Sequence, residues 1–188
     1  MTDVTTTTTS LHDLDGTYAI DASHSRIGFS TRHAMVTKVR GAFNDIEGIA
    51  STGTGLQDAS IRLTIQVGSV DTRSADRDGH LRSPDFFDVE TYPTMTFSST
   101  EVTAVDEETL RVTGDLTIKD VTRPVTVDFE YAGAATDPFG NQRIGFEGST
   151  VVNRKDFGLT WNAALETGGV LVADKVTLEF EISAIKSV

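Results

Sequence analysis

The sequence predicts an all-β protein: an eight-stranded antiparallel β-barrel with a short helical cap segment around residues 70–93. Apolar and polar residues alternate with a period of two along eight segments, which is typical of antiparallel strands with one dry and one wet face. Gly, Asp, Asn, Pro and Thr cluster between these segments, where turns favour them. No segment of useful length has the 3.6-residue period of a helix.

The predicted strands account for most of the chain after residue 16. In chain order the eight strands lie at 26–33, 39–48, 60–70, 93–100, 110–118, 124–131, 143–151 and 176–183, and 17–21 is a candidate for an additional short one. The clearest alternation is at 60–70, where Ile61, Leu63 and Ile65 share one side of the strand. Arg62 and Thr64 share the other side.

Eight such strands can form either a sandwich or a closed barrel. Several glycines lie inside the strand patterns, namely Gly28, Gly41, Gly114, Gly145 and Gly148. Glycine within a strand marks a bend, a bulge or a close backbone approach, and closure of a barrel needs these features. The sequence therefore favours a barrel, whose interior either is filled by side chains or holds one small ligand.

The composition limits the classes of partner. The formal net charge of -12 disfavours nucleic acid and anionic membrane surfaces, and no stable membrane insertion is expected. Cysteine is absent, which excludes thiolate catalysis and cysteine-bound metal. Residues 1–15 contain a threonine tract without a hydrophobic face and are expected to be a disordered tail before one domain at 16–188. A basic start and an apolar run typical of a secretory signal are not seen, so the expected compartment is cytoplasmic.

The connection from Val70 to Pro93 is far longer than a hairpin loop of two to five residues. It contains Leu81, Phe86 and Phe87, whose side chains favour burial, so disorder is not expected. Short helical turns there would bring these side chains over one end of the barrel. Two interpretations stay open: a cap over a ligand-binding lumen, or a packed crossover that only completes the core.

Five segments together resemble the signature of the YceI-like family, in the family's order and spacing. They are IDASHSRIGFSTRH (20–33), VRGAFNDIEG (39–48), RDGHLRSPDFFDVETYPTMTF (77–97), GDLTIKDVTRPV (114–125) and NRKDFGL (153–159). The resemblance covers residues 16–186. It implies an elongated lipocalin-like barrel that binds a polyisoprenoid, an isoprenoid quinone or a similar long-chain amphiphilic lipid for storage, transport or sequestration. It also implies a homodimer, and many members of the family are periplasmic.

The apolar faces supply the candidate ligand-binding residues. They are Phe29, Phe43, Ile61, Leu63, Ile65, Leu81, Phe86, Phe87, Phe97, Leu116, Phe129, Phe146, Leu178 and Phe180. Each buried methylene contributes about 0.8 kcal/mol, so a long apolar chain could bind without a specific hydrogen bond. The alternative is that the same residues are an ordinary core, which would leave a dimeric structural or partner-binding module with a filled barrel.

The candidate polar rim holds six side chains that would fix the cap to the barrel or contact a head group. They are Arg26, His33, Arg77, Asp78, His80 and Arg154. No histidine pair has the spacing of a local metal site, and neither a metal nor any other cofactor is predicted. Arg154 and Asp156 are expected to form an ion pair. No catalytic residues are predicted, although an enzyme that uses His33, His80 or Asp78 at the barrel mouth stays an alternative.

Overall fold

The computed structural model describes residues 9–187, which form one sheet of eleven strand segments together with short helices. The strands are β1 (Gly16–Ile20), β2 (Arg26–His33), β3 (Thr37–Phe43), β4 (Ile46–Thr52), β5 (Ser60–Gln66), β6 (Val70–Asp71), β7 (Thr94–Ala104), β8 (Thr109–Ile118), β9 (Val121–Thr136), β10 (Gln142–Asn153) and β11 (Val172–Lys186). The α-helix is α1 (Ala75–Arg82), and the 3-10 helices are η1 (Leu11–Asp13), η2 (Ala22–His24), η3 (Thr54–Leu56), η4 (Val67–Ser69) and η5 (Arg154–Phe157).

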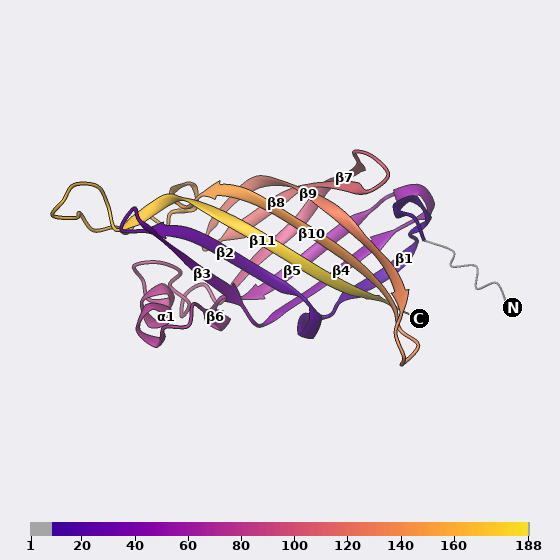
Figure 1. The fold of residues 1–188 in the computed structure, drawn as a ribbon, viewed down its shortest axis with the longest axis horizontal. Coiled ribbons are helices and arrows are strands. Elements are labelled where there is room, and N and C mark those ends of the chain that lie inside the picture. Colours follow the sequence, from indigo (N-terminus) through magenta and orange to yellow (C-terminus); the bar gives the residue numbers. More distant parts are fainter. Residues whose placement is uncertain (1–8, 188) are drawn as a thin grey trace, which may run out of the picture.

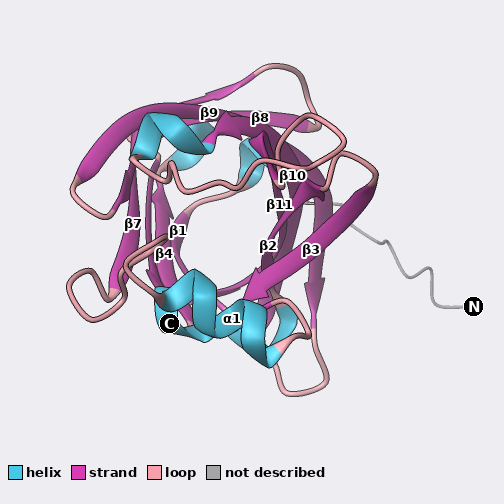
Figure 2. Ribbon diagram, turned by 90° about the vertical axis from the view of Figure 1, so that its left-hand side faces the viewer, coloured by secondary structure: helices cyan, strands magenta, loops and turns pink. Residues whose placement is uncertain are grey.

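The sheet closes into a barrel. Neighbouring strands follow the order β1-β4-β5-β7-β8-β9-β10-β11, and β1 also pairs with β11, which completes the ring. Figure 1 shows the elongated barrel from the side, and Figure 2 looks into it from the end where α1 lies. Every pairing is antiparallel. The predicted antiparallel barrel is confirmed.

The eleven segments make eight wall strands because three of these strands are interrupted. β1 and β2 both pair with β11 and are separated by η2, and β5 and β6 are separated by η4. β3 and β4 are separated at Asn44 and Asp45, so the single strand predicted at 39–48 bends there. Ser69 accepts hydrogen bonds from both backbone N–H groups at this bend. Its carbonyl accepts from the Asn44 N–H at 3.3 Å, and its hydroxyl accepts from the Asp45 N–H at 3.0 Å.

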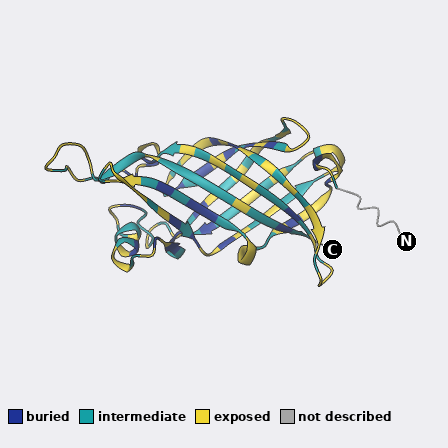
Figure 3. Cartoon of the chain, in the orientation of Figure 1, coloured by how far each residue is buried: buried dark blue, intermediate teal, exposed yellow. Residues whose placement is uncertain are grey.

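More buried residues alternate with exposed ones along the wall strands, as the banding in Figure 3 shows, so alternate side chains face the interior of the barrel. They form two apolar clusters. One lies toward α1 and includes Ile27, Phe43 and Ile65, and the other includes Tyr18 and Val112. Phe97 and Phe129 pack against both clusters and so connect the two halves of the interior.

The N-terminal prediction is wrong in part. Residues 1–8 lie outside the described residues, but Leu11 and Leu14 are buried, with exposed fractions of 0% and 5%. They belong to the cluster of Tyr18 and Val112, so the segment at 9–15 fills the barrel end opposite α1 (Figure 1). We call residues 9–15 the N-terminal plug. Residues 11–14 are therefore part of the folded barrel and do not form a disordered tail.

The predicted cap is confirmed as an element of structure. α1 and the turns at 83–92 lie between β6 and β7, and Figure 2 shows α1 across one side of the barrel end. Ser74 is the N-cap of α1, and its hydroxyl accepts from the Arg77 N–H at 3.4 Å. Among the described residues, no helix has the length and apolar character needed to cross a bilayer.

Candidate functional site: a capped apolar lumen

Buried Asp78 anchors the cap to the wall. Its Oδ1 accepts hydrogen bonds from the N–H of Thr72 at 2.9 Å and from the Thr72 hydroxyl at 2.6 Å. Arg77 holds the same residue, because its Nε donates to the Thr72 hydroxyl and its Nη2 to the Thr72 carbonyl, both at 2.7 Å. Thr72 directly follows β6. Two residues of the predicted polar rim therefore fix α1 to the end of the wall and not to Arg26, His33 or Arg154.

The adjacent phenylalanines of the cap have different surroundings. Phe87 packs against the cluster inside the barrel, where its ring lies edge-on to Phe43 with centroids 5.9 Å apart. Phe43 in turn lies 5.6 Å from Phe29, so a row of three rings runs from the cap into the lumen. Phe86 is buried outside this row, against His80 and Trp161.

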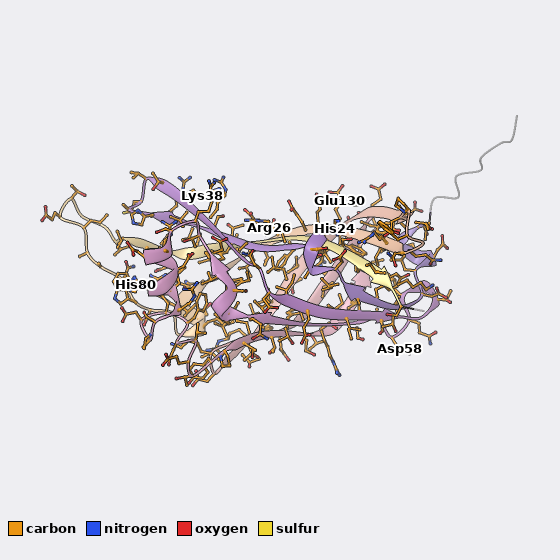
Figure 4. The ribbon with its side chains drawn as sticks, turned by 90° about the horizontal axis from the view of Figure 1, so that it is seen from below. His24, Arg26, Lys38, Asp58, His80 and Glu130 are labelled. Atoms are coloured by element: carbon orange, nitrogen blue, oxygen red, sulfur yellow. The ribbon has the colours of Figure 1, made fainter. Side chains whose placement is uncertain are left out.

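Trp161 lies in the connection between η5 and β11 and packs against the cap. Its ring lies 4.5 Å from His80 and 5.4 Å from Phe86, measured between centroids. The Nε2 of His80 is also 2.9 Å from Asp85. His80, labelled at the cap end in Figure 4, thus joins two segments that cover this end of the barrel. The His80 ring therefore packs against Phe86 and Trp161 and lies within hydrogen-bond distance of the Asp85 carboxylate.

Arg154 is a buried hub for backbone carbonyls. Its guanidinium donates to the carbonyls of Ala173 at 2.9 Å, Leu159 at 2.5 Å, Trp161 at 2.9 Å and Val172 at 3.3 Å. These carbonyls flank the connection that carries Trp161. Burial lowers the pKa of Arg154.

The predicted ion pair of Arg154 with Asp156 is wrong, since Asp174 is the carboxylate near Arg154, at 3.8 Å. Asp174 lies at the start of β11, far from Asp156 in sequence. This end of β11 follows the connection that the hub holds, which brings Asp174 to the guanidinium.

The wall of the lumen is apolar and aromatic. Phe129 lies 5.7 Å from Phe180 and 6.5 Å from Phe146 between centroids, so rings from β9, β10 and β11 meet. A glycine on an adjacent strand gives room to a ring: a Cβ at Gly114 would lie 2.5 Å from the Phe97 ring. Glycine is therefore required at this position of β8, where the ring of β7 crosses it.

The structure places the predicted ligand-binding residues in or against the two interior clusters. Within or packed against them are Phe29, Phe43, Ile61, Leu63, Ile65, Leu81, Phe87, Phe97, Leu116, Phe129, Phe146, Leu178 and Phe180. The remaining one, Phe86, is buried beside Trp161. Several inward-facing rings, including Phe29, Phe97 and Phe129, stay only half-buried. Contact of these residues with a ligand stays a prediction.

The two remaining residues of the predicted rim, Arg26 and His33, form no hydrogen bond or ion pair with the cap within residues 9–187. Only His33 lies at the same barrel end, where it pairs with Val172 at the start of β11. Arg26 is on the outer surface near the middle of the barrel (Figure 4), where its guanidinium is 3.3 Å from Glu179 and donates to the Gly41 carbonyl. His33 is exposed at the end of β2. The described residues contain no group of three His, Asp or Glu side chains that could hold a metal ion.

Some residues of this region were not predicted from the sequence. Thr72 and Trp161 are single polar and aromatic residues in loops, and nothing in their local pattern indicates their partners. Leu11 and Leu14 are three residues apart in a polar segment, which was the one available signal for the plug. The threonine tract before both leucines gives the whole segment the composition of a disordered tail.

A concavity also lies on the outside of the barrel. It is a groove of about 800 Å³. Its lining is mostly acidic and comprises Asp106, Glu107, Glu108, Thr109, Asp128, Glu130, Glu147, Gly148, Ser149, Glu179, Phe180 and Glu181. An apolar chain that covered these carboxylates would remove their hydration, and this desolvation costs free energy. The groove is thus unsuited to the aliphatic part of a lipid.

Comparisons with known proteins agree with this geometry. The family model described as "YceI-like domain" matches residues 18–184. A UPF0312 protein of Ectopseudomonas mendocina is 40% identical over 146 residues, which cover 76% of each chain. Among solved structures, BcnA of Burkholderia cenocepacia has a TM-score of 0.76 at 25% identity, with 87% of this chain and 98% of that one covered.

A second structural neighbour has the same fold at lower identity. It is a polyisoprenoid binding domain from Saccharophagus degradans that is implicated in plant cell wall breakdown. Its TM-score is 0.69 at 17% identity, with 90% of this chain and 98% of that chain covered.

Proposed function

The chain belongs to the YceI-like family, and on this basis we propose that its barrel binds a long-chain amphiphilic lipid of the polyisoprenoid or isoprenoid-quinone type. The lipid would lie with its apolar chain in the lumen, for storage, transport or sequestration. The polyisoprenoid binding domain with the same fold supports this class of ligand. In this proposal the protein is a binding protein and not an enzyme.

The observation that carries the proposal is the inward face of the wall. Several of its aromatic rings, among them Phe29, Phe97 and Phe129, are only half-buried although they point into the barrel, which favours a lumen with unfilled space. Among the described residues, no buried side-chain nitrogen or oxygen lacks a hydrogen-bond partner. Such a lumen offers apolar contact and few polar anchors. A long hydrocarbon chain gains about 0.8 kcal/mol for each methylene that it buries there.

The cap region favours the same class of ligand. Phe87 continues the row of Phe43 and Phe29 to the barrel end, so an apolar surface reaches from the lumen to the cap. His80 and Asp85 lie beside this end and would be near the head group. The dimer that the family resemblance implies is part of the proposal, and light scattering at several protein concentrations tests it.

Adjacent positions of β11 provide the test. Leu178 faces the interior cluster, whereas Thr177 is the next residue and points to the other side of the wall. We expect Leu178→Asn to weaken binding of a fluorescent prenyl probe by about tenfold or more, because a buried amide without a partner opposes an apolar chain. Thr177→Asn is the matched control and should change the affinity by less than about twofold.

The readout is a fluorescence titration with protein whose folding is verified by circular dichroism. Equal effects of the two substitutions would contradict binding in the lumen. Failure of every prenyl alcohol and quinone probe to bind the unmodified protein would contradict the proposed function itself and favour the filled-barrel alternative. Extraction of the purified protein with organic solvent, followed by mass spectrometry, would identify a lipid that copurifies.

A further inference from the structure

The N-terminal plug closes the barrel end opposite the cap with apolar side chains. Leu11 and Leu14 are buried among inward-facing residues of four wall strands. The residues around them are Tyr18 of β1, Leu110 and Val112 of β8, Ile144 of β10 and Ala184 of β11. The leucines therefore occupy the interior of the barrel, in the space that an apolar chain extending from the cap would otherwise reach.

Several contacts hold the plug in place. The Tyr131 hydroxyl, which comes from β9, donates to the carbonyl of Thr9 at 3.0 Å. Asp13 stabilises the N-terminus of η1, because its carboxylate accepts from the N–H of the N-cap residue Ser10 at 3.1 Å. Asp15 at the other end of the plug pairs with Lys186 of β11 at 2.8 Å. The plug is thus fixed to the wall at both of its ends.

The plug precedes the part of the chain that matches the family model, since that match begins at residue 18. Its residues are also unusual in composition: two buried leucines stand in a segment that is otherwise polar. The wall residues around them belong to the matched domain. Residues that precede the matched domain therefore contribute to the apolar packing at this end of the barrel.

Apolar side chains line the interior continuously between the two ends. Phe97 and Phe129 pack against the cluster near the cap and against the cluster that contains Leu11. A chain that lies along these rings would meet the leucines next. Since affinity for an apolar chain grows with the number of methylenes that leave water, it stops growing at the length at which the chain reaches a closed end.

We propose that the N-terminal plug sets the maximum length of the isoprenoid chain that the barrel accepts, with Leu11 and Leu14 as the residues that end the lumen. This inference rests on the proposed function and specifies its ligand. The chain enters from the cap end, and units beyond the limit stay outside the barrel or prevent closure of the cap.

The experiment compares the chain of residues 1–188 with its Leu11→Ala/Leu14→Ala variant. Binding of farnesol, geranylgeraniol and solanesol is measured by displacement of a fluorescent prenyl probe, and folding is checked by circular dichroism. In the unmodified protein, affinity should rise with chain length and then level off. In the variant, solanesol should gain about tenfold or more because additional methylenes are buried, whereas farnesol should change by less than about threefold.

Leu159→Ala is the matched control, because Leu159 is a buried leucine of the cluster near the cap. It makes the same change of side chain at the other end of the interior and should leave the length preference unchanged. Tyr131→Phe provides a second variant that leaves the leucines intact and removes the hydroxyl that holds Thr9. It should favour solanesol over farnesol by a smaller factor than the leucine variant.

The outcomes separate the two proposals. If prenyl alcohols bind and the length preference is the same in all variants, or shifts equally in Leu159→Ala, the plug does not measure chain length. If the leucine variant fails to fold, an unchanged preference in Tyr131→Phe overturns the inference, and a shift toward solanesol supports it. If no prenyl alcohol binds the unmodified protein, the proposed function fails first and the plug only completes a core.

Discussion

The ring of Phe87 in the cap lies edge-on to the ring of Phe43 in β3, with 5.9 Å between the centroids and 75° between the planes. The preceding residue, Phe86, faces away from this pair, toward Trp161. One residue of the cap thus extends the apolar surface of the lumen, and its neighbour fastens the cap to another segment. The two side chains have the same chemistry but separate tasks in the proposed function.

The first prediction compares these neighbours. Phe86→Ala should destabilise the fold by about 3–5 kcal/mol, because it removes a buried ring from the packing with His80 and Trp161. Phe87→Ala should cost less, since Phe87 is only partly buried, but should speed the exchange of a bound fluorescent prenyl lipid by about tenfold or more. Urea unfolding and stopped-flow displacement measure the two effects. Equal exchange rates in both variants, corrected for the folded fraction, would make the cap a plain structural crossover.

The second prediction concerns the Arg154 hub. Arg154→Met should lower the free energy of unfolding by at least about 3 kcal/mol, because several carbonyls lose their donor at once. Arg154→Lys should not restore the stability, since an ammonium group cannot reproduce the planar set of guanidinium donors. Arg111→Met is the control: Arg111 forms an exposed ion pair with Asp128, whose loss should cost less than about 1 kcal/mol. Denaturant unfolding of the variants gives the comparison, and a full rescue by lysine would be inconsistent with the hub.

Much of the wall could be predicted from the sequence, because strand parity is a local property. The alternation at 60–70 placed Ile61, Leu63 and Ile65 on one side, and the structure puts all three against the interior clusters. The cap was predicted from its length and its aromatic residues. Local patterns could not show the direction of Phe86 relative to Phe87, because that depends on Trp161, which lies far away in sequence.

The errors have the same physical origin. Arg154 and Asp156 are close in sequence, which suggested a pair, but the guanidinium turns inward to carbonyls of the connection and toward Asp174. The plug was missed because a threonine-rich segment has too few apolar residues to fold by itself. Leu11 is buried only because it packs against wall residues at the barrel end. Such burial is a tertiary property that no window of sequence contains.

The third prediction is a pH dependence that involves Arg143. Its Nη1 lies 2.7 Å from Asp21 and its Nε 2.8 Å from Asp137. The pKa of Asp21 is held well below the usual carboxyl range, chiefly by the hydrogen bond from Arg143. The pKa of Asp137 is lowered similarly, first by Asn141 and then by Arg143. Carboxylates with a lowered pKa stabilise the fold above the pKa of the unfolded chain, near pH 4, and this stabilisation is lost as the pH falls further.

Arg143→Met should therefore be destabilised by a constant amount at neutral pH, and the difference from the unmodified protein should shrink below about pH 4. Arg62→Met is the control, since Arg62 is exposed and has no ion pair within residues 9–187. Urea unfolding at a series of pH values measures both. A difference that stays constant down to about pH 2 would show that Arg143 acts through packing and not through the two carboxylates.

The last prediction concerns a row of like charges on the outer wall. Glu147 in β10 lies directly opposite Glu130 in β9 and directly opposite Glu181 in β11. All three side chains are exposed, and they line the acidic groove. Carboxylates in directly opposed positions repel one another across the strands, so Glu147→Gln should raise the free energy of unfolding by about 0.2–1 kcal/mol for each relieved pair.

Glu47→Gln changes the net charge by the same amount at an exposed position of β4 that lies opposite Thr64, so it reports the effect of overall charge alone. Because exposed charges are screened over about 10 Å at 0.1 M salt and about 3 Å at 1 M salt, the advantage of Glu147→Gln over Glu47→Gln should decrease as salt is added. Thermal or urea unfolding at low and high salt measures this advantage. If the two variants gain equally, the repulsion is a property of the whole acidic protein, and the register of β9, β10 and β11 contributes nothing to it.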